Sequence, residues 1–435
     1  MGQSSVLRWF LVALASTLAI YNLGRSFMGP KHGRDFVQYY ASGRALLDGR
    51  PDLVYAGGPD YQQYVESLGI ARPTEFDGRT LPHMTNAYPP FVAVMAMPLA
   101  LLPFGLARNL FFAMGLAAAA LSVWLLFADR PPGQRRAMIL AGLAGTALFF
   151  PTYSSLYMGQ VNSLLALLLI AALALSRKNR QWSAGAAVGL AGAIKVFPFI
   201  MVVWFLITRR YRAAIGAVLA CAAVVAVSLI WVDLRLYGQY LTEVFPAKSM
   251  SQATRLSQGL FGLFYRLLTP GNSVQPIADM PLLAGILAIG SAAGCILATI
   301  LVVRRAARDE KSTDLGFALF LVAAILATPK SWDHYGVFLL PAYLLLFEAF
   351  AREAQAWPRW LVLASAVSYC GWAFILTTAA ELSQLPTGVL FQPAWSVKCI
   401  STLLLWGCTA RVLGRLTGQT SPREKGVSTP PCKQA

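Results

Sequence analysis

Apolar runs long enough, or nearly long enough, to cross a lipid bilayer recur from one end of this 435-residue chain to the other. A spanning helix needs about 20 mainly apolar residues, because the hydrocarbon core of a bilayer is about 30 Å thick. The runs begin near Val6, Leu106, Ala137, Gly159, Ser183, Val196, Ala213, Pro281, Asp314, Tyr335, Trp360 and Trp395. They predict an all-α polytopic membrane protein with about twelve transmembrane helices (eleven to thirteen) in a single integral membrane domain, residues 1–435.

The composition agrees with a membrane protein and excludes several other classes. Hydrophobic residues make up 57% of the chain and charged residues only 13%, whereas about a quarter of an ordinary soluble domain is charged. The six cysteines are scattered, without the paired spacing of a zinc site or a disulfide framework. A soluble enzyme, a disordered tail and a disulfide-stapled secreted module are therefore excluded.

The net charge of +17 reflects membrane topology and does not indicate nucleic-acid binding. Alternate loops and the ends of the chain hold 21 of the 36 Lys and Arg residues but only five of the 19 Asp and Glu residues. Because basic residues mark the cytoplasmic side, these segments are predicted to be cytoplasmic, with both termini and a tail of residues 411–435 among them. The pattern suits a multi-pass protein of a bacterial plasma (inner) membrane, with no nucleic acid as a partner.

Two apolar segments are interrupted by residues that disfavour a simple crossing. Residues 88–104 contain four prolines, which remove backbone donors, and this segment is predicted to be re-entrant or interfacial. Lys195 and Pro198 interrupt the second of these segments, which comprises the runs that begin near Ser183 and Val196. We expect two short helices that meet at the outer surface, with one 24-residue span as the alternative.

Two long segments are predicted on the outer face, residues 25–87 and residues 233–280. Both are longer than a turn between helices requires, and such loops are usually functional. Polar side chains near the outer helix ends accompany them, and the chemistry is therefore predicted at that surface, with residues 25–87 as the catalytic loop.

Asp35 precedes a run in which Phe36, Tyr39, Tyr40 and Gly43 share one face at helical spacing. The run predicts an interfacial helix with Asp35 at its N-terminus. Asp35 could then be a helix cap, worth about 1 kcal/mol, or a general base that takes a proton from a hydroxyl group. The two roles are compatible.

The other candidate residues also have two interpretations each. Gln160 and Asn162 could cap a helix or bind sugar hydroxyls. Lys195 could extend to the membrane surface or pair functionally within it. Residues 328–335 could form an aromatic belt with a Lys–Asp pair, or bind an anion through Lys330 and His334.

Several motifs of other enzyme classes are missing. The sequence has no Walker loop, no Gly-x-Gly-x-x-Gly opening a helix after a strand, no His-Glu-x-x-His and no Asp-x-Asp. Glu75 and Asp77 form the nearest approach to a metal motif. Nucleotide-driven chemistry and a tightly bound metal are therefore not expected.

Five motifs in order along the chain resemble those of family 87 glycosyltransferases, membrane enzymes of the C-type fold that use polyprenyl-phosphate sugars as donors. They are Asp35 with Tyr39, Tyr40 and the stretch to Tyr55; Tyr88-Pro89-Pro90 with Pro98-Leu99; Gly159-Gln160-Val161-Asn162; Lys195 with Pro198; and Pro329 to His334. Where the family often has two adjacent histidines, this chain has His334 and Tyr335.

The resemblance implies a C-type architecture with a long first outer loop, and an inverting transfer of a sugar, mannose as the first choice, from a polyprenyl-phosphate carrier to an acceptor hydroxyl on the outer face. Asp35 would be the catalytic base. Lys195, Lys330 and His334 would bind the lipid phosphate, and Tyr39, Tyr88, Gln160 and Asn162 would bind acceptor or sugar. The acceptor would be a glycolipid or a polysaccharide, and neither metal nor other cofactor would be needed.

A multi-pass transporter or lipid flippase is the alternative from another class. Such a protein would show inverted repeats and charges near the membrane midplane. No clear repeat is present, but Glu348 and Lys398 lie within predicted helices without an evident reason. An assembly subunit without activity is a third alternative, and the presence of Asp35 argues against it.

Overall fold

The computed structural model describes residues 33–71, 85–246, 257–271, 275–306, 310–350, 357–381 and 392–419, together with Tyr21, Gly24 and Ala253. The predicted first span from Val6, the pair Glu75 and Asp77, and tail residues 420–435 lie outside the described residues.

Every regular element within these ranges is helical. The elements are α2 (Phe36–Leu47), η1 (Pro51–Leu53), α3 (Gly58–Ser67), α4 (Pro90–Ala100), α5 (Phe104–Phe127), α6 (Pro132–Leu148), α7 (Phe150–Met158), α8 (Asn162–Arg177), α9 (Gln181–Ile194), η2 (Phe197–Ile200), α10 (Met201–Ile207), α11 (Tyr211–Ser228), α12 (Leu234–Gln239), η3 (Tyr240–Val244), α14 (Leu260–Leu268), α15 (Pro281–Arg305), α16 (Glu310–Ala327), η4 (Asp333–Leu339), α17 (Leu340–Phe350), α18 (Trp357–Glu381) and α19 (Gln392–Gln419).

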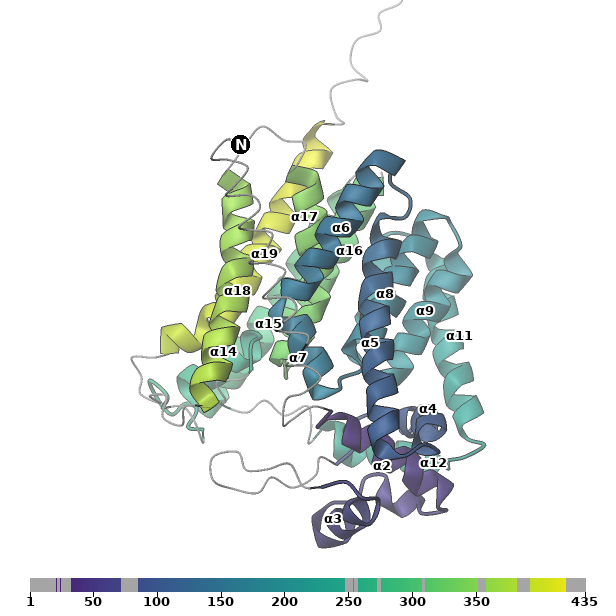
Figure 1. Cartoon of the computed structure of the whole chain (residues 1–435). Helices are drawn as coiled ribbons and strands as arrows, with labels where there is room; N and C mark the ends of the chain where they lie inside the picture. The colour runs from purple at the N-terminus through teal and green to yellow at the C-terminus, as the bar shows by residue number, and fades with distance from the viewer. Residues whose placement is uncertain are drawn as a thin grey trace, which may run out of the picture.

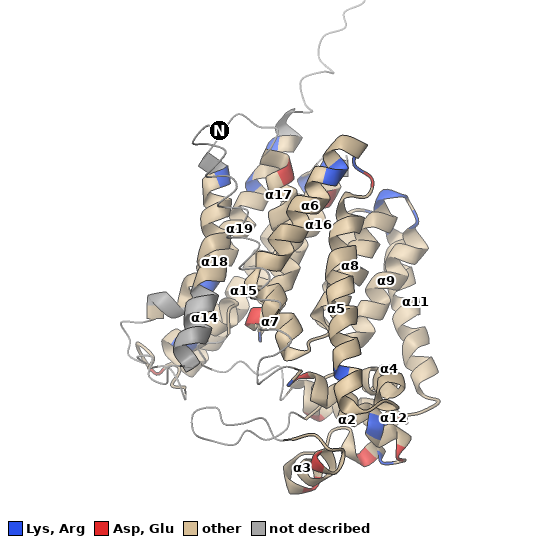
Figure 2. Cartoon of the chain, viewed as in Figure 1, with Lys and Arg blue, Asp and Glu red and all other residues tan. Residues whose placement is uncertain are grey.

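The long helices run in one general direction, and the short helices α2, α3, α4 and α12 gather at one end of them, the lower end in Figure 1. We call this the loop end. Lys and Arg residues gather at the opposite end, at the top of Figure 2, which we call the basic end. The predicted separation of basic loops from long mixed-charge segments therefore corresponds to two ends of one helical bundle.

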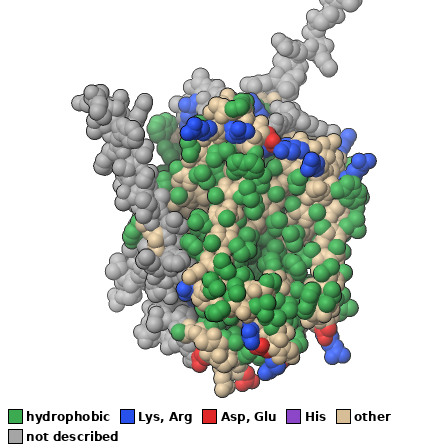
Figure 3. All heavy atoms as spheres, turned by 45° about the vertical axis from the view of Figure 1, so that its right-hand side comes forward, with side chains coloured by type: hydrophobic (Ala, Val, Ile, Leu, Met, Phe, Trp, Pro, Cys, Tyr) green, Lys and Arg blue, Asp and Glu red, His purple; other side chains and the backbone are tan. Residues whose placement is uncertain are grey.

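An apolar surface lies between the two ends, as Figure 3 shows for one face. Its exposed side chains include Leu219, Ile286 and Ile289, each more than half exposed. In water such a surface would favour association, whereas lipid tails solvate it at no cost. The described part of the chain is therefore a membrane-spanning helical protein.

Four described helical segments are long and apolar enough to cross a membrane: α5, α11, α15 and Ser396–Leu416 of α19. The pair α6 and α7, bent by 61°, would form a fifth. The prediction of about twelve spans is not confirmed, because several helices are too short. α8 has 16 residues, and at 1.5 Å per residue it is about 24 Å long.

The predicted break at Lys195 is confirmed. α9 ends at Ile194, Lys195 has an extended backbone (φ −152°, ψ 130°), and the chain continues through η2 into α10. Pro198 lies at the start of η2, where its missing backbone N–H costs no helical hydrogen bond.

The predicted amphipathic character of the helix after Asp35 is wrong. Residues 36–43 of α2 are all buried, including Gln38 and Ser42, so the helix has no polar face toward solvent there. α4 covers α2 closely: a Cβ atom added to Gly43 would lie 2.9 Å from the carbonyl carbon of Ala96. Tertiary packing therefore encloses a helix that its sequence alone places at an interface.

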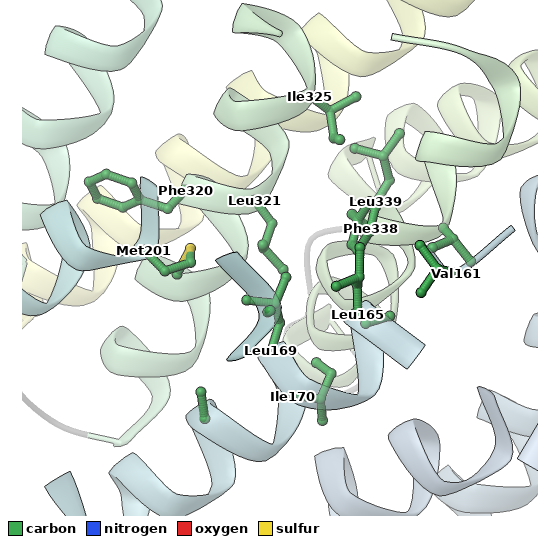
Figure 4. Close-up of a cluster of buried hydrophobic side chains, with 14 of the residues drawn as sticks. Val161, Leu165, Leu169, Ile170, Met201, Phe320, Leu321, Ile325, Phe338 and Leu339 are labelled. Atoms are coloured by element: carbon green, nitrogen blue, oxygen red, sulfur yellow. The ribbon is translucent and has the colours of Figure 1, made fainter. Parts of the chain in front are cut away.

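Buried apolar side chains join α8, α16 and η4 in the middle of the protein. Leu165 and Leu169 of α8 lie in one cluster with Phe320 and Leu321 of α16 and with Phe338 (Figure 4). In a bilayer these helices associate through close packing, since the surrounding lipid is as apolar as the side chains themselves. The cluster fixes α8 relative to η4, and both elements carry residues of the site described below.

The charges that sequence reasoning left unexplained have partners. At the basic end, Arg130 contacts Asp314 and Glu348 at 2.8 Å each, and Arg177 contacts Asp314 at 2.8 Å. Lys398 of α19 pairs with Asp333 at the start of η4. These buried ion pairs connect separate helices, which is the usual way that charges are tolerated within a membrane protein.

Candidate functional site

Two glycines allow the segment before α2 to dock against the junction of α7 and α8. The backbone N–H groups of Gly33 and Asp35 donate to the carbonyls of Tyr157 (2.9 Å) and Met158 (2.8 Å). Gly159 has a φ of +70°, and a Cβ atom there would lie 2.8 Å from the Phe36 Cβ. A side chain at Gly159 would thus be strained and would push the segment away. The docking sets Asp35 beside Gln160.

Asp35 is buried, with 8% of its surface exposed. It occupies the N-cap position of α2, but its side chain makes no capping hydrogen bond. Instead its carboxylate accepts a hydrogen bond from Nε2 of Gln160. The helix-cap interpretation of Asp35 is therefore wrong, and the carboxylate is directed into a contact between two distant parts of the chain.

Gln160 connects this carboxylate to two tyrosines. Its Oε1 accepts hydrogen bonds from the hydroxyl groups of Tyr88 (2.8 Å) and Tyr39 (3.4 Å). The two rings meet edge to face, with centroids 5.0 Å apart. The amide of Gln160 is thus used as donor and acceptor within the site, and not as a helix cap.

Burial raises the pKa of Asp35 above its ordinary value, while the Gln160 hydrogen bond and the positive charges of Arg34 and Lys195 partly oppose this shift. A raised pKa makes a carboxylate a better proton acceptor, because the transfer of a proton to it becomes less unfavourable. The environment of Asp35 therefore suits a general base.

Asn162 and Lys195 form a second set of contacts close to the first. Lys195 Nζ donates to Oδ1 of Asn162 (3.1 Å), and Asn162 Nδ2 donates to the backbone carbonyl of His334 (3.0 Å). The capping interpretation of Asn162 is wrong too, since no side chain caps the start of α8.

Lys195 is enclosed by aromatic rings and is only 9% exposed. Its Nζ lies 3.8 Å from the ring centroid of Tyr335, 5.3 Å from that of Tyr88 and 6.0 Å from that of Phe197. Ring faces attract a cation. Lys195 therefore does not extend to the membrane surface, and its amine is held inside the protein.

Tyr88 belongs to both sets of contacts, because its hydroxyl binds Gln160 and its ring faces Lys195. We call the joined set, Asp35, Tyr39, Tyr88, Gln160, Asn162 and Lys195, the Asp35 cluster. The structure thus brings together residues that the sequence analysis singled out from four separate segments.

His334 and Lys330 lie in the segment that packs against the cluster. His334 is buried, its ring stacks on Trp332 (6.4 Å between centroids), and its carbonyl, not its imidazole, contacts Asn162. Lys330 is partly exposed in the turn that leads into η4.

Tyr335 is the main residue that sequence reasoning missed. It occupies the position where the family often has a second histidine, and this departure was the available signal. In the structure its ring centroid lies closer to Lys195 Nζ than those of Tyr88 and Phe197 do, and the ring centroids of Tyr335 and His334 are 5.2 Å apart.

A surface groove with a volume of about 700 Å³ lies near the cluster at the loop end. Its lining includes Asp52, Trp231, Gln239 and Glu243. Tyr240, which directly follows Gln239, stacks on Tyr55, and the Tyr55 hydroxyl donates to the carbonyl of Tyr88 at 2.7 Å. One ring pair therefore connects the segment beside the groove with the backbone of Tyr88.

The site as a whole offers a buried carboxylate, a buried lysine amine and several hydroxyl and amide groups. Among the described residues, no group of three His, Cys, Asp or Glu side chains could hold a metal ion. The arrangement can accept a proton at Asp35 and stabilise negative charge near Lys195.

The model of glycosyltransferase family 87 matches residues 86–329. A polyprenol-phosphate-mannose-dependent alpha-(1-2)-phosphatidylinositol pentamannoside mannosyltransferase of Mycobacterium tuberculosis is 31% identical over 356 residues, which cover 78% of this chain and 74% of that protein. The chain is also 27% identical to a polyprenol-phosphate-mannose-dependent alpha-(1-2)-phosphatidylinositol mannoside mannosyltransferase of Mycolicibacterium smegmatis. This match covers 82% of this chain and 79% of that protein.

Among solved structures, the chain is similar to ArnT from Cupriavidus metallidurans bound to undecaprenyl phosphate. The TM-score is 0.43 and the identity 15%, over 96% of this chain and 78% of ArnT.

Proposed function

The chain belongs to glycosyltransferase family 87 and is a membrane glycosyltransferase, and we propose that it transfers mannose from a polyprenol-phosphate carrier to a hydroxyl group of an acceptor. The names of two relatives support polyprenol-phosphate mannose as the donor, since both are described as polyprenol-phosphate-mannose-dependent mannosyltransferases. The single observation that carries the proposed chemistry is the joining of a buried carboxylate and a buried lysine within the Asp35 cluster.

Asp35 is the catalytic base of the proposed reaction. Its carboxylate takes the proton of the acceptor hydroxyl, and the oxygen attacks the anomeric carbon of mannose from the face opposite the phosphate. The bond between this carbon and the phosphate oxygen breaks, and polyprenyl phosphate leaves with the bonding electrons. Attack from the opposite face inverts the anomeric configuration. Gln160 holds the carboxylate in place through its hydrogen bond.

Lys195 stabilises the charge that develops on the leaving phosphate. A fixed cation in a water-poor site can supply this stabilisation without a metal ion, and Lys195 is held by Asn162 and Tyr335. Lys330 and His334 complete the proposed phosphate site, and Tyr39 and Tyr88 bind acceptor or sugar with Gln160 and Asn162.

The groove beside η3 is the proposed route of the acceptor. It combines the indole ring of Trp231 with carboxylate and amide groups of Asp52, Gln239 and Glu243. Sugars bind to such surfaces, because C–H groups pack on the ring while hydroxyl groups bond to the polar side chains. An acceptor that carries a carbohydrate, either a glycolipid or a polysaccharide, fits this lining.

The basic end is proposed to face the cytoplasm, which places the Asp35 cluster on the outer side of the plasma membrane. Positive loops resist translocation and support this orientation, with both termini cytoplasmic. α4 has 11 residues, about 16 Å of helix, so residues 88–104 are proposed to be interfacial or re-entrant. The shorter helices would complete the count of about twelve spans.

The alternative of a transporter or flippase has lost its main support. It rested on Glu348 and Lys398, and these side chains pair with Arg130 and Asp333. Their charges have structural partners, so no transport pathway is needed to account for them.

The donor is tested with the purified protein in nanodiscs, a crude lipid acceptor extract, and radiolabelled mannose supplied either on polyprenyl phosphate or on GDP. The proposal predicts labelled product from polyprenyl-phosphate mannose alone. Transfer from GDP-mannose in carrier-free preparations would contradict it. Absence of transfer from either donor, with a second preparation from this family active on the same extract, would favour the transporter.

A further inference from the structure

A second cavity, with a volume of about 380 Å³, lies at the basic end of the protein. Residues at the ends of α8, α10 and α15 and near the starts of α9 and α16 line it, and none of these residues belongs to the Asp35 cluster. Four of its described lining residues are arginines, namely Arg177, Arg209, Arg210 and Arg304.

The charge of this cavity is positive after its ion pairs are counted. Arg177 is neutralised by Asp314, with its Nε and Nη2 atoms 2.8 Å and 2.9 Å from the two carboxylate oxygens. Within the described ranges, no carboxylate partner is found for Arg209, Arg210 or Arg304. Three guanidinium groups of the described lining are therefore without a carboxylate partner among the described side chains.

Arg210 is fixed in the wall of the cavity. Its Nη1 donates to the carbonyl of Ser176 at 2.7 Å, and its Cζ lies 5.6 Å from the ring centroid of Trp204. Arg209 and Arg304 are exposed beside it. One guanidinium group is thus held by the protein, and two are exposed at the cavity.

The same wall contains buried donors without a partner in the described part of the chain. Ser176 is 3% exposed and Trp204 is 0% exposed, and both line the cavity. The Ser176 hydroxyl and the Trp204 indole N–H make no hydrogen bond to any described residue. Such groups usually have a partner, and neither donor has one within the described wall of the cavity.

Asn179 and Arg209 have φ values of +55° and +57°. Each lies just past the end of a helix, where the N–H of the next residue, Arg180 or Arg210, donates to the carbonyl of Leu175 or Phe205. A left-handed residue in this place is a common way to end a helix, so α8 and α10 both end at the cavity.

We propose that this cavity binds the phosphate group of an anionic phospholipid in the membrane leaflet at the basic end. Arginine binds phosphate through paired N–H groups, and basic pockets between helices at a membrane surface accept lipid headgroups. Trp182 and Tyr211, in the first turns of α9 and α11, are each about half exposed, at 52% and 55%. Exposed Trp and Tyr side chains mark the headgroup level of a bilayer, so the cavity lies where lipid phosphates lie.

The test measures binding of a short-chain phosphatidylglycerol to the purified full-length protein in a zwitterionic detergent. The variant Arg209→Ala/Arg304→Ala removes two exposed guanidinium groups of the cavity. The control Arg135→Ala/Arg136→Ala removes two exposed arginines at the same end that do not line the cavity. We expect at least tenfold weaker binding by the cavity variant and less than twofold change in the control.

Two further arms decide the assignment. Trp204→Phe removes one wall donor with little change of volume, and it should also weaken binding if the indole N–H meets the ligand. Inorganic phosphate at the same concentration should not displace the lipid. Equal losses in the two arginine variants would overturn the proposal in favour of general surface charge, and displacement by inorganic phosphate would overturn the lipid assignment.

Discussion

Replacement of Gln160 by methionine should separate the positioning of Asp35 from its basicity. The substitution keeps the length of the side chain but removes the amide that donates to Asp35 and accepts from Tyr88. A hydrogen bond to a charged group contributes about 1.5–3 kcal/mol. Loss of this bond leaves the carboxylate unheld, and because a catalytic group displaced by about 1 Å can cost about 100-fold in rate, we expect kcat at high pH to fall about 10- to 100-fold although the higher pKa favours proton transfer.

The pH dependence gives a second, independent signature. The Gln160 hydrogen bond lowers the pKa of Asp35 against the effect of burial, so its removal should raise this pKa further. The base is active when deprotonated, and the acid limb of the rate profile should therefore move to higher pH in Gln160→Met.

The assay is initial-rate transfer from polyprenyl-phosphate mannose between acidic and neutral pH. Tyr88→Phe removes one bond to Gln160 but leaves the bond to Asp35, so its acid limb should stay in place. Gln134→Met, at an exposed position in α6, is the control for an unrelated glutamine. An acid limb and a plateau rate for Gln160→Met equal to those of Gln134→Met would refute the reasoning.

Three other outcomes follow from the geometry. Gly159→Ala places a Cβ atom 2.8 Å from the Phe36 Cβ at a φ of +70°. We expect at least tenfold lower activity and about 1–2 kcal/mol lower unfolding free energy. The control Gly145→Ala, where the nearest atom is 3.9 Å away, should keep the wild-type activity and stability. Lys195→Met should lower the transfer rate by a factor of about 100, while EDTA should leave the wild-type rate unchanged; a rate abolished by EDTA and restored by a divalent metal would contradict the assigned role. Glu348→Gln removes one of two carboxylates around Arg130, so thermal unfolding should show a loss below about 3 kcal/mol without a change in activity per folded molecule. Lost activity at full stability would contradict the structural role assigned to Glu348.

The sequence predicted those features that depend on local chemistry. The break at Lys195 follows from a lysine and a proline within a short apolar run, and it is present between α9 and η2. The family followed from motifs in order along the chain, and the family model confirms it. The grouping of cationic loops was also readable, because their charges recur between apolar runs.

Contacts between distant segments could not be predicted in this way. Gln160 binds a carboxylate 125 positions earlier, and nothing at either position specifies the other, so local capping was the simpler expectation for both. The burial of α2 depends on α4 lying over it, and the pairing of Lys398 with Asp333 depends on how α19 packs. The number of spans could not be fixed either, because short helices such as α8 do not satisfy a length criterion by themselves.

The most direct test of the central claim compares Asp35→Asn with Asp60→Asn in transfer from polyprenyl-phosphate mannose. Asp60 is an exposed carboxylate in the first turn of α3, and the asparagine variant of Asp35 keeps the shape of the side chain but cannot accept the proton. With both variants folded as judged by size-exclusion chromatography, the account predicts full activity for Asp60→Asn and loss of at least a factor of 1,000, about 4 kcal/mol, for Asp35→Asn. Equal rates in the two variants would contradict the assignment of Asp35 as the catalytic base.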